Sequence, residues 1–268
     1  MGRLAILACG GALPVMLAKA HPDALHFTLT GVPSALADTA QDFALEEIGS
    51  LFSAMKAADV TDMVFAGTLT RPALDPTRFD AAMMRIAPRL MQAIPQGDDA
   101  LLRTVIGIFE DEGFTVKGAH ALLPDLVADM ALQAGPEPST AEQADIARAA
   151  EIMMALSPVD IGQGCVVAGG QCLGIETVQG TDALLGFVAG TPDKLRRGHK
   201  GVYVKAPKAG QDLRIDMPAI GPATVELAAR AGLAGIMVQA GGVLVLDHAG
   251  VVLAAEAHGI FIRAGALG

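Results

Sequence analysis

The sequence has no tryptophan, one tyrosine and only three cysteines among its 268 residues. It therefore lacks the aromatic platform on which single-stranded bases stack, and a formal charge of −10 would repel a nucleic-acid backbone. Cys9, Cys165 and Cys172 are odd in number and have no metal-type spacing, which favours reduced thiols in a cytosol over a disulfide framework. We expect a cytoplasmic protein that does not bind nucleic acid.

Export signals and long apolar runs are also lacking. The N-terminal apolar run is broken at Cys9-Gly10-Gly11, too early for a signal peptide, and no run of about 20 apolar residues could form a membrane span. P-loop, H-E-x-x-H and G-x-S-x-G motifs are absent. A phosphate-processing enzyme with this sequence would depend on fixed cations, backbone donors and few carboxylates.

The segment from Gly201 to Glu226 carries such a set, namely Lys205, Lys208, Arg214 and Asp216. Lysine and arginine hold phosphate through charge and geometry, and a carboxylate can bind Mg²⁺ or Mn²⁺ or orient a water. The alternative interpretation is a surface loop with ordinary ion pairs.

The first half of the chain alternates strands and helices. A strand from Leu4 to Ala8, a Cys9-Gly10-Gly11 turn and a helix from Leu13 form the generic nucleotide-binding opening, although a tight turn without a ligand is the alternative. Further strands are predicted at 26–30, 63–66 and 114–116, and helices at 43–58, 80–93 and 100–112. This alternation predicts a mainly parallel, Rossmann-like sheet with helices on both faces.

Polar residues cluster where these elements end or begin. Gly67, Thr68, Thr70 and Arg71 follow the third strand, where ligands commonly sit in parallel sheets; a helix-capping or surface role is the alternative for Arg71. Asp98 or Asp99 is a natural N-cap for the helix that follows.

Residues 133–140, QAGPEPST, predict a linker between an N-terminal α/β domain at 1–132 and a C-terminal α+β domain at 141–268. Ser139 or Thr140 would cap a helix at 141–155, and Thr181 or Asp182 a helix beginning near Ala183. Gly169-Gly170-Gln171 between two apolar runs predicts a hairpin. Further strands at 202–205, 236–240, 243–246 and 260–262 would complete a mixed sheet.

Seven stretches, in the same order, resemble the UDP-2,3-diacylglucosamine pyrophosphatases of lipid A biosynthesis, the family unrelated to metallophosphoesterases. They are CGGALP (9–14), FAGTLTRP (65–72), GDDALLR (97–103), EGFTVKGAH (112–120), DIGQG (160–164), ETVQGTDALL (176–185) and VKAPKAGQDLRIDMPAIGPATVE (204–226). Two positions depart from the family pattern, with Cys9 in place of a glycine and Gln179 in place of an acidic residue.

The resemblance implies hydrolysis of UDP-2,3-diacylglucosamine to UMP and 2,3-diacylglucosamine 1-phosphate (lipid X), with water attacking the sugar-side phosphorus. Mg²⁺ is the implied cofactor, with Mn²⁺ as its alternative. The resemblance also implies two domains that bind the lipid-sugar and close over it. It further implies a peripheral location on the cytoplasmic face of the inner membrane. A homodimer is the commonest assembly for such a chain.

The resemblance also implies roles for particular residues. Asp216 and Asp182 would be catalytic metal ligands, and Lys205, Lys208 and Arg214 would stabilise charge on the phosphoryl oxygens. The substrate-binding residues would be Gly10, Gly11, Arg71, Asp98, Gln163, Glu176, Thr181 and Thr224.

Two other classes compete with this interpretation. A non-catalytic regulator that binds nucleotide-sugars or lipids would release no UMP. A dinucleotide-dependent oxidoreductase is disfavoured by the incomplete glycine fingerprint and by the lack of an acidic residue about 20 positions further on.

Overall fold

The computed structural model describes residues 2–69 and 73–267, and these divide into two compact units. Residues up to Pro124, together with Asp212–Asp216, form the first unit. Asp125–Gln211 and the residues from Met217 onward form the second. The chain therefore leaves the second unit once, for a short segment that is part of the first.

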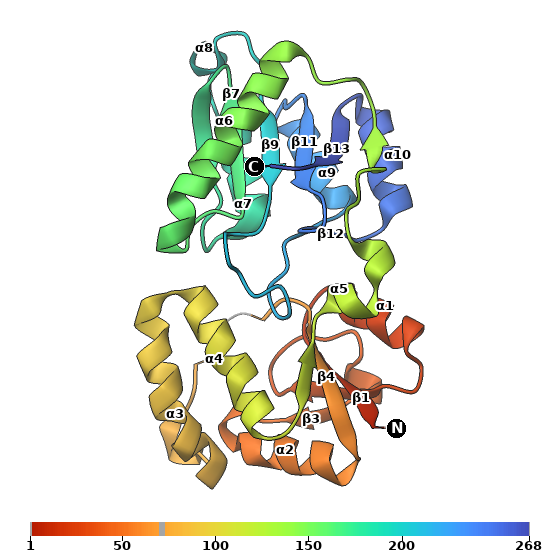
Figure 1. Cartoon of the computed structure of the whole chain (residues 1–268), viewed down its shortest axis with the longest axis vertical. Helices are drawn as coiled ribbons and strands as arrows, with labels where there is room; N and C mark the ends of the chain where they lie inside the picture. The colour runs from red at the N-terminus through yellow and green to blue at the C-terminus, as the bar shows by residue number, and fades with distance from the viewer. Residues whose placement is uncertain (1, 70–72, 268) are drawn as a thin grey trace. The chain divides into compact units, whose positions relative to one another are not determined.

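The first unit contains a parallel sheet with the strand order β3-β2-β1-β4-β5, shown in red to yellow-green in Figure 1. Its strands are β1 (Arg3–Ala8), β2 (Leu25–Leu29), β3 (Gln41–Phe43), β4 (Val60–Ala66) and β5 (Thr115–Lys117). This confirms the predicted Rossmann-like sheet. Parallel strands place their carboxyl ends at one edge, where the turns after β1 and β4 meet.

Helices cover both faces of this sheet. They are α1 (Leu13–Ala20), α2 (Ile48–Ala57), α3 (Ala81–Ala93), α4 (Asp98–Asp111) and α5 (Ala119–Leu122). Ala5 and Leu7 of β1 belong to a core shared with α2, α3 and α4. Ile6 and Ala8 are equally buried and point to the opposite face, because side chains alternate along a strand; α1 packs on β1 there, and α5 packs on β4.

The second unit contains a mixed sheet with the strand order β6-β13-β11-β9-β7-β8. Its strands are β6 (Gln133–Ala134), β7 (Gly164–Ala168), β8 (Gln171–Ile175), β9 (Val202–Lys205), β11 (Gly235–Gln239) and β13 (Phe261–Gly265). The pairs β13-β11 and β11-β9 are parallel, and the remaining pairs are antiparallel. The predicted α+β character is confirmed.

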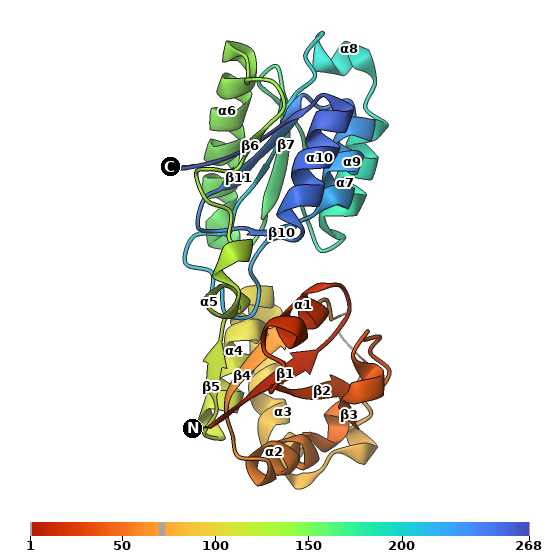
Figure 2. The same cartoon turned by 90° about the vertical axis from the view of Figure 1, so that its right-hand side faces the viewer.

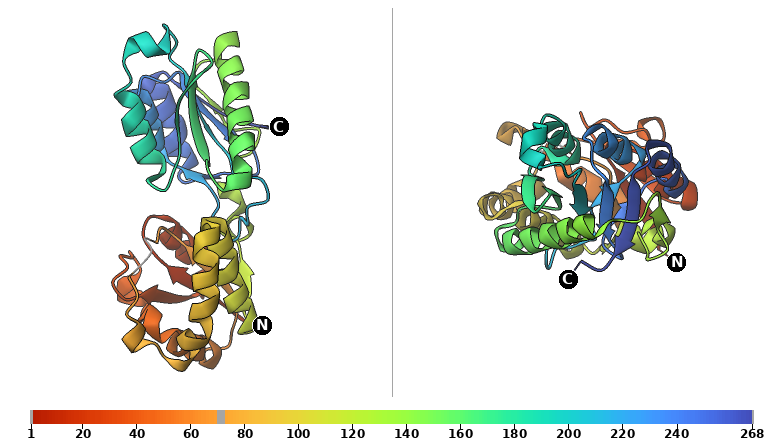
Figure 3. Two further views of the ribbon diagram at one scale, coloured as in Figure 1. Left: turned by 90° about the vertical axis from the view of Figure 1, so that its left-hand side faces the viewer. Right: turned by 90° about the horizontal axis from the view of Figure 1, so that it is seen from above.

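The helices of the second unit are α6 (Thr140–Leu156), α7 (Gly180–Ala189), α8 (Asp193–Arg196), α9 (Pro222–Arg230) and α10 (His248–His258). As Figures 2 and 3 show, α7, α9 and α10 lie on one face of the sheet and α6 on the other. Strand β9 is central in this arrangement. Val202 and Val204 face α6, whereas Tyr203 faces the core that contains α7 and α9.

Several local predictions are confirmed. The hairpin of β7 and β8 forms as expected, with both turn glycines at positive φ (+56° and +75°), as a tight two-residue turn requires. Ser139 caps α6 in a capping box with Glu142. None of the helices formed by the described residues combines the length and apolar character needed to cross a bilayer.

Other local predictions were wrong. Gly97, not Asp98 or Asp99, is the N-cap of α4, so both aspartates lie within its first turn. Neither Thr181 nor Asp182 caps α7, because that helix begins at Gly180 after Gln179. In both cases the helix begins before the first apolar residue of its helical pattern. The residues of its first turn face solvent or polar neighbours, so they need not be apolar.

Strand assignments also needed correction. Residues 43–58 do not form one helix, since β3 ends at Phe43 and α2 begins at Ile48. β12 (Leu244–Val245) pairs with β10 (Ala219–Ile220) in a separate small sheet instead of joining the mixed sheet. Within the segment interpreted as a linker, Gln133 and Ala134 form β6 and pair with β13. Short edge strands carry too few residues for a recognisable alternation.

Asp145 of α6 links this helix to the β7–β8 turn. Its side chain is buried, and its two carboxylate oxygens accept hydrogen bonds from the backbone N–H groups of Gly169 (2.9 Å) and Gly170 (2.7 Å). A hydrogen bond to a charged acceptor is among the stronger contacts in a folded protein.

We expect Asp145→Ala to lower the free energy of unfolding of the second unit by about 2–3 kcal/mol, since hydrogen bonds to a charged group are lost. Native-state hydrogen exchange of the β7 and β9 amides measures this change. The matched control is Glu151→Ala on the same helix. Its exposed carboxylate pairs with Arg148 at the surface, and its loss should change stability by less than about 0.5 kcal/mol. Equal effects of the two substitutions would contradict the role of Asp145.

Candidate active site

A buried lysine lies at the centre of a polar cluster in the second unit. Lys205 ends β9, and its side chain is only 4% exposed. Its ammonium lies 3.1 and 3.0 Å from the two carboxylate oxygens of Glu176 and 2.6 Å from Oγ1 of Thr181. Because an unpaired charge at this depth would be very costly, Lys205 depends on the Glu176 carboxylate as its buried partner.

Tyr203 completes this cluster from the same face of β9. Residues two apart on a strand share a face, so its hydroxyl reaches the same carboxylate as Lys205 and donates to Glu176 across 2.9 Å. Burial first, and the nearby Glu176 charge second, raise the pKa of the Tyr203 hydroxyl well above its usual value, so that it stays protonated as a donor. Thr181 also donates to Glu176, across 3.0 Å.

The Glu176 cluster (Glu176, Thr181, Tyr203 and Lys205) is therefore a closed network. Three groups donate to one carboxylate, and the ammonium of Lys205 is directed at Glu176 and Thr181. The geometry supports a role for Lys205 in fixing these two side chains, of which Glu176 follows directly after β8 and Thr181 lies in the first turn of α7 beside the exposed Asp182. Sequence reasoning did not find Tyr203, although its i, i+2 relation to Lys205 was a usable signal.

Lys208 occupies a second ion pair in the same unit. Its ammonium pairs with Asp160, whose backbone adopts a left-handed conformation (φ +60°) after the short helix Ser157–Val159. Ala206 donates to the backbone carbonyl of Gln163 (3.0 Å), and Ala209 donates to the Ser157 hydroxyl (2.6 Å). The loop after β9 is therefore held against residues 157–163, which brings Lys208 and Gln163 to the same region as Lys205.

Thr224 has a local structural contact. It is buried in the first turn of α9, where its hydroxyl accepts a hydrogen bond from the Gly221 backbone N–H across 3.3 Å. This contact caps the helix.

Arg214 and Asp216 belong to the segment that is part of the first unit. Arg214 donates to Asp212 at 2.7–3.2 Å and to Glu110 of α4 at 2.7 Å, and Ile215 packs on the core of that unit. Hydrogen bonds from Arg214 hold the pKa of the Asp212 carboxyl below its usual value. The cations of the segment Gly201–Glu226 are therefore divided between the two units, with Lys205 and Lys208 in the second and Arg214 in the first.

The glycine turn of the first unit is held at the carboxyl ends of β1 and β4. Gly10 and Thr68 exchange two backbone hydrogen bonds, of 3.1 and 2.9 Å. Gly67 has φ +95°, and a Cβ there would lie 2.1 Å from the Gly10 carbonyl oxygen, so the close approach requires glycine. Gly11 and the end of β4 therefore share one edge of the sheet. Thr70 and Arg71 lie outside the described residues.

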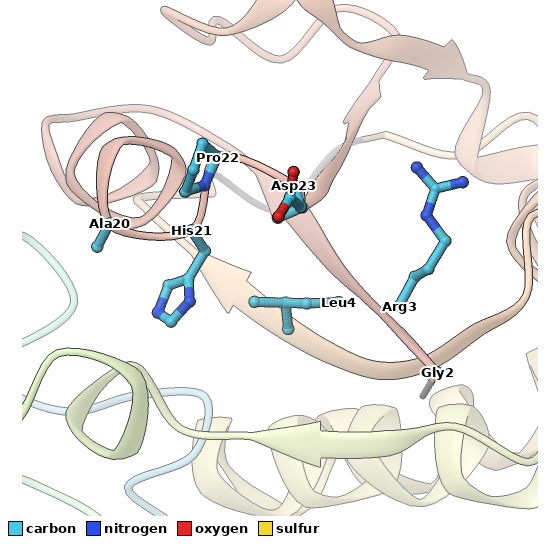
Figure 4. Close-up of a pocket in the computed structure, with 8 residues that line it drawn as sticks. Gly2, Arg3, Leu4, Ala20, His21, Pro22 and Asp23 are labelled. Atoms are coloured by element: carbon cyan, nitrogen blue, oxygen red, sulfur yellow. The ribbon is translucent and has the colours of Figure 1, made fainter.

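A cavity of about 760 Å³ in the first unit is separate from this turn. It is lined by residues 2–4 and 20–24, among them Arg3, His21 and Asp23 (Figure 4). Because it lies at the beginning of β1, it is at the strand end opposite to Gly10 and Gly11.

Both units match known sequences. A profile described as the LpxI N-terminal domain matches residues 3–126, and one described as the LpxI C-terminal domain matches residues 130–263. The chain belongs to the LpxI family. It is 39% identical, over 272 residues, to the UDP-2,3-diacylglucosamine pyrophosphatase LpxI of Caulobacter vibrioides, and the match covers 98% of this chain and 97% of that relative. The family resemblance seen in the sequence is thereby confirmed.

The donor set for a divalent metal in this LpxI family chain is sparse. Among the described residues, no three His, Cys, Asp or Glu side chains gather to form a metal site. Mg²⁺ commonly uses one or two carboxylates and completes its shell with water and substrate phosphates. Asp216, in the first unit, and Asp182, in the second, are each a carboxylate of the kind that such a shell uses.

We expect Lys205→Met to lower the stability of the second unit by about 3–5 kcal/mol, because it leaves the Glu176 charge buried without a cation. The double variant Lys205→Met/Glu176→Gln should recover most of this loss. Native-state hydrogen exchange of β9 and β7 measures both effects.

The matched control for this pair is Arg148→Met, which removes an exposed ion pair with Glu151 in the same unit and should cost less than about 1 kcal/mol. A double variant as unstable as Lys205→Met would argue against charge burial as the cause.

Proposed function

We propose that this protein hydrolyses the pyrophosphate of UDP-2,3-diacylglucosamine to UMP and 2,3-diacylglucosamine 1-phosphate. The observation that carries the proposal is the match of both units, over nearly their whole length, to the LpxI family and to a relative named for this pyrophosphatase activity. The glycine turn of the first unit supports it, because backbone N–H groups between a strand end and a helix start commonly face an anion, and Lys208 and Arg214 carry the charge that attracts a phosphate.

In the proposed reaction, a water oxygen attacks the sugar-side phosphorus. The bond between that phosphorus and the bridging oxygen breaks, UMP leaves with the bridging oxygen, and the water gives up its proton. Asp216 would orient the water and accept this proton. Mg²⁺, held by Asp216 and Asp182 together with substrate phosphates, would supply charge stabilisation for the phosphoryl oxygens.

The remaining residues would bind and order the substrate. Lys208 and Arg214 would stabilise negative charge on the phosphates, each exchanging part of its present carboxylate pairing for phosphate. Lys205 would act mainly by holding Glu176 and Thr181 in place. Gly10, Gly11, Asp98 and Gln163 would contact the substrate, and the diacyl substrate would bring the protein to the cytoplasmic face of the inner membrane.

The decisive assay measures turnover of UDP-2,3-diacylglucosamine in detergent, with Mg²⁺ or with a chelator, in ¹⁸O-labelled water. We expect UMP to form only with the metal, and the label to appear in the diacylglucosamine 1-phosphate. Label in UMP would place the attack on the other phosphorus. If the substrate binds and no UMP forms under any metal condition, the protein is a binding regulator instead.

We expect Asp216→Ala to lower kcat by about 10²–10³-fold while substrate binding persists, since one transition-state electrostatic group is removed. Steady-state kinetics and direct binding separate the two effects. The matched control is Asp193→Ala, an exposed carboxylate at the start of α8, which should retain activity. Activity of Asp216→Ala within a few-fold of the unaltered protein would remove Asp216 from the mechanism.

A further inference from the structure

Two cysteine sulfur atoms face each other across the β7–β8 hairpin. Sγ of Cys165 on β7 lies 3.9 Å from Sγ of Cys172 on β8. In the strand register Cys165 is opposite Ile175 and Cys172 is opposite Val167, with an irregularity between Val166 and Val167. The cysteines are therefore diagonal neighbours on one face of the hairpin, which the irregularity brings within contact distance.

The two thiols differ in access to solvent. Cys165 is fully buried in the core under α6, whereas Cys172 is exposed. A hydrogen bond with Cys165 is the main cause that lowers the pKa of Cys172 to about 6, and the positive charge of Arg148 acts in the same direction. The same hydrogen bond and burial raise the pKa of Cys165. An exposed thiolate beside a second thiol is the arrangement found in peroxide-sensitive cysteines.

We propose that Cys172 and Cys165 form a peroxide-responsive pair, in which the exposed Cys172 is oxidised first and the buried Cys165 resolves it into a disulfide. The proposal rests on their 3.9 Å contact, on the unequal exposure of the two side chains and on their place in the hairpin that leads to Glu176. Its effect on activity rests in addition on the function proposed above.

The chemistry needs hydrogen peroxide as the oxidant and no other reactant. The Cys172 thiolate attacks one peroxide oxygen, the O–O bond breaks, and hydroxide leaves and is protonated to water. Cys172 is now a sulfenic acid. The Cys165 sulfur attacks the Cys172 sulfur, the S–O bond breaks, and the departing hydroxide takes the Cys165 proton as a second water. The pair of cysteines thereby loses two electrons in total, and one molecule of hydrogen peroxide is reduced to two molecules of water.

Disulfide formation would disturb the Glu176 cluster. The two sulfur atoms must approach from 3.9 Å to about 2.05 Å, and we expect β8 to shift against β7 as they do so. Glu176 follows directly after β8, and its backbone N–H donates to the Gly164 carbonyl at the start of β7 across 2.7 Å. A shift of β8 against β7 therefore moves the carboxylate that holds Lys205.

The test treats the full-length protein with hydrogen peroxide and maps its peptides without reduction. We expect one tryptic peptide that contains both Cys165 and Cys172, lighter by two hydrogen atoms and closed to alkylation at both cysteines, while Cys9 remains open to alkylation after unfolding. The amide of Glu176 should exchange hydrogen faster in the oxidised protein. Activity on UDP-2,3-diacylglucosamine should be lost and then restored by dithiothreitol.

Two variants make the result specific. Cys172→Ser should keep its activity under peroxide, and the matched control Cys9→Ala should lose it as the unaltered protein does. Oxidation of Cys172 to sulfinic acid without a cross-link, or peroxide inactivation that persists in Cys172→Ser, would overturn the proposal.

The assays also separate this proposal from the proposed function. A cross-link that changes neither the exchange of Glu176 nor activity would overturn the connection to the Glu176 cluster. If the untreated protein does not turn over the substrate, the proposed function fails. Peptide mapping then still tests whether the disulfide forms, and hydrogen exchange still tests its effect on the structure.

Discussion

The second unit depends on the burial of one positive charge. Lys205 ends the central strand β9, where burying an unpaired ammonium in an apolar core would cost a large part of the folding free energy. Glu176 supplies the opposing charge, and Thr181 and Tyr203 satisfy the remaining polar atoms. Because these partners come from the end of β8, the start of α7 and β9 itself, one ion pair fixes the mutual position of three elements. That rigidity suits the phosphate-binding role proposed for the neighbouring residues.

The path of the chain imposes a second constraint. Between β9 and β10 the chain contributes Asp212–Asp216 to the first unit, where Arg214 pairs with Glu110 and Ile215 joins the core. The proposed catalytic Asp216 is therefore anchored through the first unit, although the sequence surrounding it belongs to the second.

The hairpin of β7 and β8 lies between helix α6 and the Glu176 cluster. Its turn is tied to α6 through Asp145, and its other end leads to Glu176. The paired thiols lie between these two anchors. The proposed oxidation would therefore act on a short hairpin whose turn is held by Asp145 and whose far end carries Glu176.

The sequence by itself determined the alternation of strands and helices, the parallel and mixed sheets, the family and the identity of most candidate site residues. These depend on hydrophobic periodicity, turn glycines and motif order, which are local properties of the chain. Tertiary structure alone decided that Lys205 pairs with Glu176, that Tyr203 joins them, and that Arg214 belongs to the first unit. Which charged side chains pair depends on their distance in the folded chain and on their burial. Neither can be read from the spacing of residues in the sequence.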